Sequence, residues 1–203
     1  MSNSTFIVDP ATGSATRVIN RRLAVDSLTS TTLARAADNG HSFDASSGLM
    51  TLTGSNETAA LYLRNDHTSF VLRPARVSVS LGRAVDGTSR DVILRVYDTT
   101  RSELYGSEPA LVSNRLLGQA ASSEVTAIRG GPGITWAPGA HLLTPVVLQA
   151  ESRAEFTTEV SMPLGTSILL TIEPPAETLA MIAVVYTVLE FYRPSGDASA
   201  IAG

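Results

Sequence analysis

The stretch of sequence that decides the fold is Leu179-Ala-Met-Ile-Ala-Val-Val-Tyr-Thr-Val-Leu-Glu-Phe-Tyr192. It is rich in Val, Ile and Tyr, which favour strands. At the two-residue period of a strand, one face carries Ile182, Val184, Tyr186 and Val188, and the other carries Met181, Ala183, Val185, Leu189 and Phe191. A strand that is apolar on both faces is normally covered on both. We therefore expect one face to lie in a sandwich core, and an N-terminal arm or a neighbouring subunit to cover the other.

Segments with the same two-residue period precede this strand, beginning near residue 48. The clearest carries Val77, Val79 and Leu81 in alternation with polar residues. Asp86-Gly87 is a tight-turn signal, and residues 91–98 then alternate again, so we predict an antiparallel hairpin. We count eight to ten short strands and no long amphipathic helix. This pattern predicts an all-β fold, an antiparallel two-sheet β-sandwich of the jelly-roll type.

The chain divides by composition into three parts. Residues 1–45 are rich in Thr, Ser, Ala, Asn and Asp with scattered apolar residues, so we expect an extended N-terminal arm that is ordered by packing on something else. Residues 46–193 hold the predicted sandwich domain, and residues 194–203 are a flexible C-terminal tail.

Composition excludes several classes of protein. The chain of 203 residues has no cysteine, which rules out disulfides, zinc–thiolate sites and cysteine nucleophiles. Its net charge is −4, although a non-specific nucleic-acid binder is usually basic. The longest apolar run is too short for a membrane-spanning helix, and the first ten residues have no basic start and no apolar run of the length of a secretion signal. We expect a protein made in the cytoplasm that binds neither nucleic acid nor membranes.

Candidate catalytic groups are sparse. The histidines His41, His67 and His141 lie far apart, and no close ligand pair indicates a metal site. Asn65-Asp66-His67 follows a predicted strand and is typical of a turn. Gly130-Gly131-Pro132-Gly133 lacks the following helix and the lysine of a phosphate-binding loop, so we expect an exposed tip. We predict no enzyme activity, catalytic residue, metal or cofactor.

Five segments, in order and spacing, resemble a family of bacteriophage virion structural proteins, the jelly-roll capsid decoration, cement or head-fibre proteins. They are Glu57–Asn65, Val77–Gly82, Ser113–Gly118, Ile128–Gly131, and Leu164–Ile168 with Ile172–Pro175. The resemblance covers roughly residues 20–192 and consists of strand-and-turn signals. The sequence departs from the family pattern at Met162-Pro163-Leu164, where Pro and Leu are transposed, and it has no lysine.

The resemblance implies a homotrimer that binds the major capsid protein on the outer surface of the head, stabilises the shell and is located in the virion. A tail, collar or fibre-head component is an alternative, as is a carbohydrate-binding module. The basic arm, the last strand and the single tryptophan supply candidate interface residues. These are Arg17, Arg21, Arg22, Leu23, Val25, Trp136, Val185, Leu189 and Phe191. Trp136 has a second interpretation as a core residue, which its usual burial favours.

Overall fold

The computed structural model describes residues 4–8, 15–19, 22–23, 37, 39–54, 56–84, 91–99, 108–131, 134–136, 145–149, 153–158, 160–175 and 180–192. Spatial clustering divides the chain into two compact units, Met1–Thr31 and Thr32–Gly203. Most of the described chain is strand, and no helix within it is long and apolar enough to cross a bilayer.

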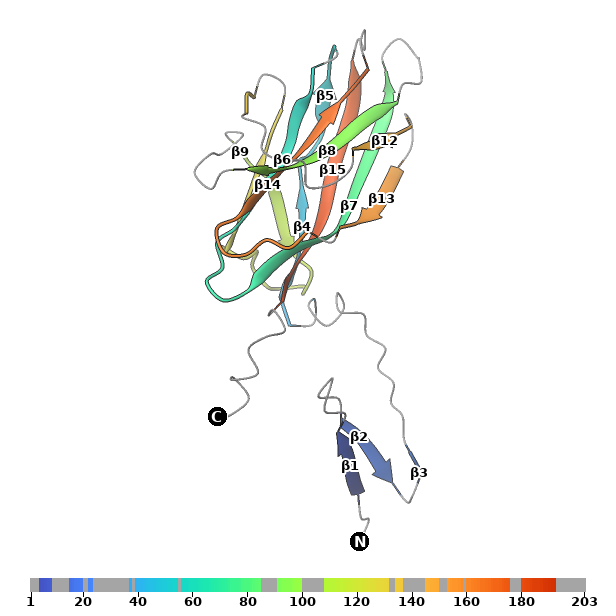
Figure 1. Ribbon diagram of the computed structural model, residues 1–203, viewed down its shortest axis with the longest axis vertical. Coiled ribbons are helices and arrows are strands. Elements are labelled where there is room, and N and C mark those ends of the chain that lie inside the picture. Colours follow the sequence, from blue (N-terminus) through green and yellow to red (C-terminus); the bar gives the residue numbers. More distant parts are fainter. Residues whose placement is uncertain are drawn as a thin grey trace. The chain divides into compact units, whose positions relative to one another are not determined.

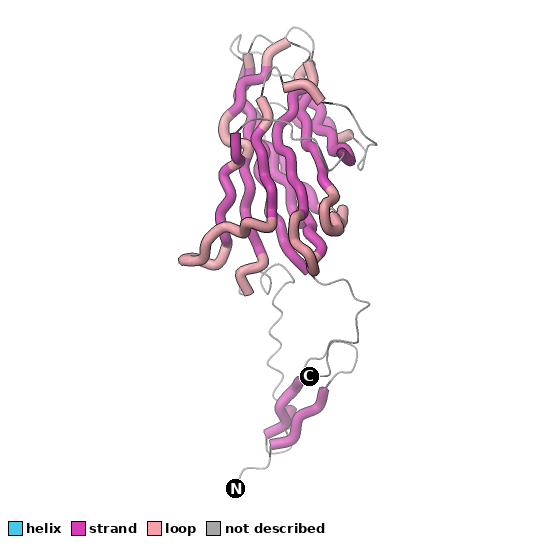
Figure 2. The backbone as a smooth tube through the Cα atoms, turned by 90° about the vertical axis from the view of Figure 1, so that its left-hand side faces the viewer, coloured by secondary structure: helices cyan, strands magenta, loops and turns pink. Residues whose placement is uncertain are grey.

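The larger unit contains two antiparallel sheets (Figures 1 and 2). The first, which we call the β15 sheet, has the order β10–β4–β15–β7–β13, with β5 also paired to β15. Its strands are β4 (Ser42–Ser46), β5 (Met50–Leu52), β7 (Val71–Ala84), β10 (Leu111–Asn114), β13 (Arg153–Thr157) and β15 (Met181–Tyr192).

The second sheet, which we call the β6 sheet, has the order β12–β8–β14–β6–β11–β9. Its strands are β6 (Thr58–Asn65), β8 (Val92–Thr99), β9 (Glu108–Pro109), β11 (Val125–Arg129), β12 (Val146–Leu148) and β14 (Ser167–Glu173). All pairings in both sheets are antiparallel.

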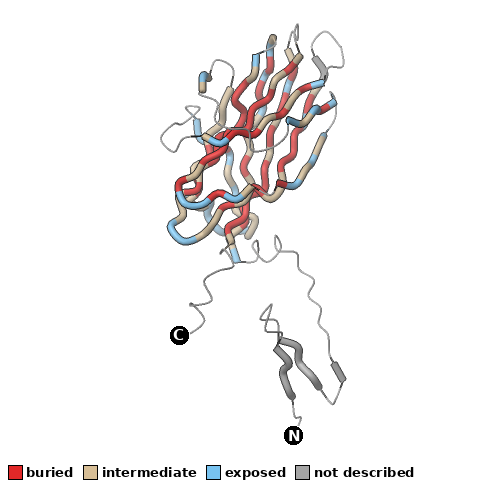
Figure 3. The backbone as a smooth tube through the Cα atoms, viewed as in Figure 1, coloured by how far each residue is buried: buried red, intermediate tan, exposed pale blue. Residues whose placement is uncertain are grey.

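The hydrophobic core lies between the two sheets. Leu81, Val185 and Leu189 contribute from the β15 sheet, and Leu63 and Leu170 contribute from the β6 sheet. Figure 3 shows the buried residues running along the facing strands. The predicted antiparallel two-sheet β-sandwich is therefore confirmed, and its core is closed by apolar side chains from both layers.

The predicted hairpin between residues 77–81 and 91–98 is wrong. β7 belongs to the β15 sheet and pairs with β15 and β13, whereas β8 belongs to the β6 sheet and pairs with β12 and β14. A turn signal predicts that the chain reverses, but not which sheet the next strand joins. The apolar residues of both strands are buried in the core that the two sheets share.

The sandwich starts earlier than the predicted residue 46, because Ser42–Ser46 forms β4 between β10 and β15. In the expected arm, the smaller unit holds a three-stranded antiparallel sheet of β1 (Ser4–Val8), β2 (Ala15–Ile19) and β3 (Arg22–Leu23). The expected tail, residues 194–203, lies outside the described residues.

Candidate interaction surface

The outer face of the β15 sheet carries an apolar stripe. Register places Val184 of β15 opposite Ser80 of β7, and Tyr186 opposite both Ser78 and Ser46. Leu111 of β10 lies beyond Ser46 in the same row. We call this surface the β15 face, and its residues are Ser46, Ser78, Ser80, Leu111, Ile182, Val184 and Tyr186.

The β15 face exposes large apolar side chains in one place. Ile182 is 52% exposed and Leu111 is 72% exposed, while Val184 and Tyr186 are half-buried between them. A single exposed leucine or isoleucine is ordinary on a protein surface, but a contiguous group is typical of an interaction site. The serines on the flanking strands are small, so they leave the central stripe accessible.

A shallow hollow of about 290 Å³ opens on this face between β10, β4 and β15. Leu111 and Tyr186 line it together with Asp44 and Ser113. Burial, and then a hydrogen bond to the Asp44 carboxylate, raise the pKa of Tyr186 to about 12. The phenol is therefore neutral at ordinary pH and provides an amphipathic wall, which protein interfaces favour.

Charged side chains border the β15 face on both sides. Arg115 lies 3.3 Å from Asp44 beside β10, and Arg76 lies 3.7 Å from Glu155 beside β13. Partial desolvation opposes ionisation of Glu155, but the Ser78 hydroxyl and the nearby guanidinium groups together lower its pKa. Exposed ion pairs add little stability. An apolar centre with a charged rim is the usual layout of a protein interface.

Three predicted interface residues of the last strand lie elsewhere. Val185 and Leu189 are fully buried and Phe191 is 4% exposed, all inside the chain's own core. They offer no surface to a partner, so their predicted interface role is wrong. The opposite face of the same strand carries the exposed side chains. Periodicity identified the two faces, but the sequence could not show which one the second sheet covers.

The β15 strand also holds a charge that sequence reasoning missed. Glu190 is 2% exposed, pairs with Arg73 of β7, and has one carboxylate oxygen without a hydrogen-bond partner. The Arg73 guanidinium also lies 5.4 Å from the centre of the Tyr192 ring. The apolar stripe of the outer face therefore ends at Val188, which is itself buried.

Trp136 is half-buried and packs on the outer face of the β6 sheet, not in the main core. Together with Ile134 it covers a second cluster that includes the buried Tyr62, Tyr97 and Leu169. Ile134 and Trp136, which follow β11, thus cover side chains of β6, β8 and β14, and β12 pairs with β8 at the opposite edge of this sheet.

The arm residues predicted as interface candidates are only partly described. Arg17 lies in β2, and Arg22 and Leu23 lie in β3, where the structure describes the backbone alone. Arg21 and Val25 lie outside the described residues.

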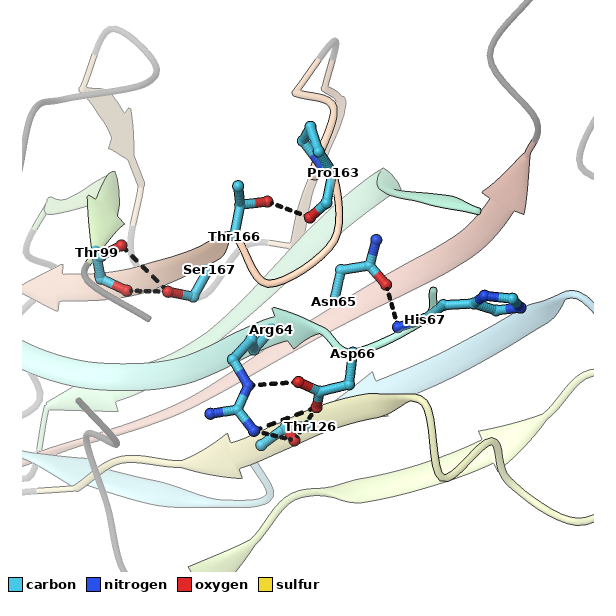
Figure 4. Close-up of polar contacts among 9 residues, drawn as sticks. All are labelled: Arg64, Asn65, Asp66, His67, Thr99, Thr126, Pro163, Thr166 and Ser167. Carbon is cyan, nitrogen blue, oxygen red and sulfur yellow. Dashed lines mark hydrogen bonds and ion pairs between the residues drawn. The ribbon is translucent and has the colours of Figure 1, made fainter. Parts of the chain in front are cut away.

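The Asn65-Asp66-His67 segment forms a turn, as predicted (Figure 4). The buried Asn65 side chain donates to the Phe70 and Met162 carbonyl oxygens at 2.9 and 2.7 Å, and accepts a hydrogen bond from the His67 backbone at 2.9 Å. The His67 side chain is 14% exposed and packs against Phe70 and Phe191.

Other chemistry receives little support from the described part of the chain. There, no three His, Asp or Glu side chains gather closely enough to hold a metal ion. A carbohydrate-binding module would need aromatic rings exposed on one face, but Tyr62 and Tyr97 are buried and Trp136 is half-buried. Among the described surfaces, the β15 face is the best candidate functional site. No protein-family model matches the chain and no curated protein matches it significantly, so this interpretation depends on geometry alone.

Proposed function

We propose that this chain is a non-enzymatic structural protein that binds copies of itself and a larger protein shell, and that the shell is a bacteriophage capsid. The observation that supports the proposal is the β15 face. Ile182 and Leu111 are exposed on a sandwich whose core is already closed without them. In aqueous solution, exposed apolar area of this kind is stabilised by contact with another protein surface.

The size of the face argues for several contacts acting together. Four strands spaced about 4.8 Å apart, with about five residues each at 3.3 Å, give roughly 300 Å². A stable interface buries about 800 Å² on each partner. One contact through the β15 face is therefore weak, whereas a closed homotrimer makes three such contacts at once, and the assembled trimer then binds a repeating shell at several points.

The first experiment measures self-association. Native mass spectrometry of the purified chain should give a trimer, and Ile182→Ser combined with Leu111→Ser should give monomers. Leu117→Ser is the matched control, since Leu117 is 93% exposed outside the β15 face. A wild-type chain that remains monomeric at micromolar concentration contradicts self-association through this face.

The second experiment measures location. Cryo-electron microscopy of DNA-filled phage heads should show many copies of the chain on the outer lattice, bound to the major capsid protein. Copies found only at the tail or collar would exclude decoration of the head. That outcome would leave the association through the β15 face intact, so the two parts of the proposal are tested separately.

A further inference from the structure

Among the described strands of the β15 sheet, β5 has a hydrogen-bonded neighbour on one side only. β4 and β5 pair one after the other along the same side of β15. They therefore occupy one strand position of the sheet, which we call a lane. β10 fills the next lane only beside β4, and its pairing ends at Leu111 opposite Ser46. Just before this point the chain is in the other sheet, where β9 pairs with β11. In the described part of the chain, β5 is therefore an edge strand.

Hydrogen bonds show which backbone groups of β5 face this open lane. The Ser47 N–H donates to the Val185 carbonyl at 2.9 Å, so the polar backbone groups of Val185 point toward the lane of β4 and β5. The alternation of an antiparallel ladder gives Ala183 and Met181 the same orientation, opposite Met50 and Leu52. Thr51, between these two, therefore directs its N–H and C=O away from β15.

A hollow of about 410 Å³ lies along the open lane. Leu49 and Thr51 line one side, and Arg129, Gly130 and Gly131 line the other. No residue other than glycine fits at position 130, because a Cβ atom there would overlap the Ala59 backbone. The volume falls within the ~300–1,000 Å³ typical of binding pockets.

The groups around the hollow favour an uncharged ligand with a regular backbone. Arg129 forms an ion pair with Glu108, which also lines the hollow, so the two charges satisfy each other. Leu49 is 77% exposed at the hollow and offers an apolar contact. The outward N–H and C=O of Thr51 match the donor and acceptor of another strand, the usual basis of recognition by strand addition.

We propose that this hollow is a strand-addition site that binds a short, uncharged, extended peptide segment of a partner protein. The segment pairs its main chain with Thr51, places an apolar side chain on Leu49 and continues the lane of β10 past Leu111. The hollow borders the β15 face, since Thr51 lies opposite Ile182, but this inference goes beyond the proposed function and does not depend on it, because pairing with Thr51 needs no self-association.

Three residues of β5 allow only a few hydrogen bonds, so we expect weak binding that a covalent tether makes measurable. The chain has no cysteine, so Leu49→Cys adds a single thiol at the hollow, and the disulfide to the peptide takes the place of the apolar contact on Leu49. The probe is the peptide acetyl-Cys-Gly-Thr-Val-Thr-Val-amide, which exchanges disulfides with the protein in excess 2-mercaptoethanol. We expect its mixed disulfide to be about tenfold more stable on Leu49→Cys than on Leu117→Cys.

Two further measurements test whether main-chain hydrogen bonds cause the tenfold preference for Leu49→Cys. A peptide with N-methyl groups on both Val residues cannot pair as a strand, and it should lose the tenfold preference. Thr51→Pro, in the Leu49→Cys chain, removes the outward N–H but no hydrogen bond to β15, and should lose the preference too, whereas Thr51→Val should keep it. Equal stability on the two thiols, or an unchanged preference for the N-methylated peptide, would overturn the proposal even if Thr51→Pro did not fold.

Discussion

At the scale of single residues, Asn65 stands out because its side chain makes three hydrogen bonds to the backbone. Its fully buried amide holds two carbonyl groups and one backbone N–H, and so joins the turn after β6 to the segment before β14. Asn65→Ala removes all three hydrogen bonds, of which the one to Met162 is buried, at about 1 kcal/mol for each bond. We expect a loss of about 3 kcal/mol in urea unfolding. Thr68→Ala, on the exposed part of the same turn, should change stability by less than about 0.5 kcal/mol.

Two tyrosines make stability sensitive to alkaline pH. Burial raises the pKa of Tyr97 to about 12, with Glu57 adding to the shift, and the pKa of Tyr186 is raised to about 12 from an ordinary value of 10.0. Between pH 10 and 12 the folded chain keeps protons that the unfolded chain releases. Their contribution is complete below pH 10 and is lost as the pH rises to 12.

Chemical unfolding at intervals across this pH range tests the tyrosines directly. The wild-type free energy of unfolding should fall through the window, and Tyr97→Phe with Tyr186→Phe should flatten the slope. The absorbance of the folded protein at alkaline pH should show these two phenols ionising late. An unchanged slope in the double variant would assign the pH dependence to other groups.

The sequence predicted some residue environments and missed others for physical reasons. The turn at Asn65-Asp66 was predictable, since these residues bond their own backbone locally. The burial of His67 was not, because Phe191, one of the rings that cover it, is more than a hundred residues away in sequence. The glycines after β11 were expected to be an exposed tip, but Gly130 packs against the Ala59 backbone through a contact that only folding creates.

At the scale of elements, β15 has one core face and one surface face, and substitutions should separate them. Leu189→Ala opens a cavity in the core and should cost about 3 kcal/mol. Ile182→Ser alters a side chain that is 52% exposed and should change stability by less than about 0.5 kcal/mol while weakening self-association. Thermal unfolding and native mass measured on both variants check the assignment. An Ile182→Ser chain as unstable as Leu189→Ala would show that the outer face is covered within the monomer.

Strand positions were easier to predict than strand partners. The predicted strand at 179–192 and the observed β15 nearly coincide, because alternation and residue type are local signals. The partners of β7 and β8 depend on which sheet closes the core, and a turn signal carries no information on that choice. The β15 face could not be predicted from the sequence for the same reason. Which side of a strand is exposed depends on which side the second sheet packs against.

At the scale of the whole molecule, the division into two units leads to a prediction about the N-terminal residues. The sandwich core is formed from Phe43 onward, and β1, β2 and β3 pair only with one another among the described strands. A sheet of three strands with two to five residues each is at the lower size limit for independent stability. We therefore expect the N-terminal unit to be stabilised by a partner, and to add little to the stability of the sandwich.

Deleting residues 1–31 tests separately whether the N-terminal unit contributes to the stability of the sandwich and to the association of subunits. Because the second unit begins at Thr32, the truncated chain should unfold within about 0.5 kcal/mol of the full chain in urea. Its native mass shows whether the arm or the β15 face holds the subunits together. A trimer that persists after truncation but dissociates with Ile182→Ser assigns assembly to the sandwich, and a truncated monomer assigns it to the arm. A truncated chain that unfolds several kcal/mol more easily would contradict the division, because the arm would then be part of the fold it precedes.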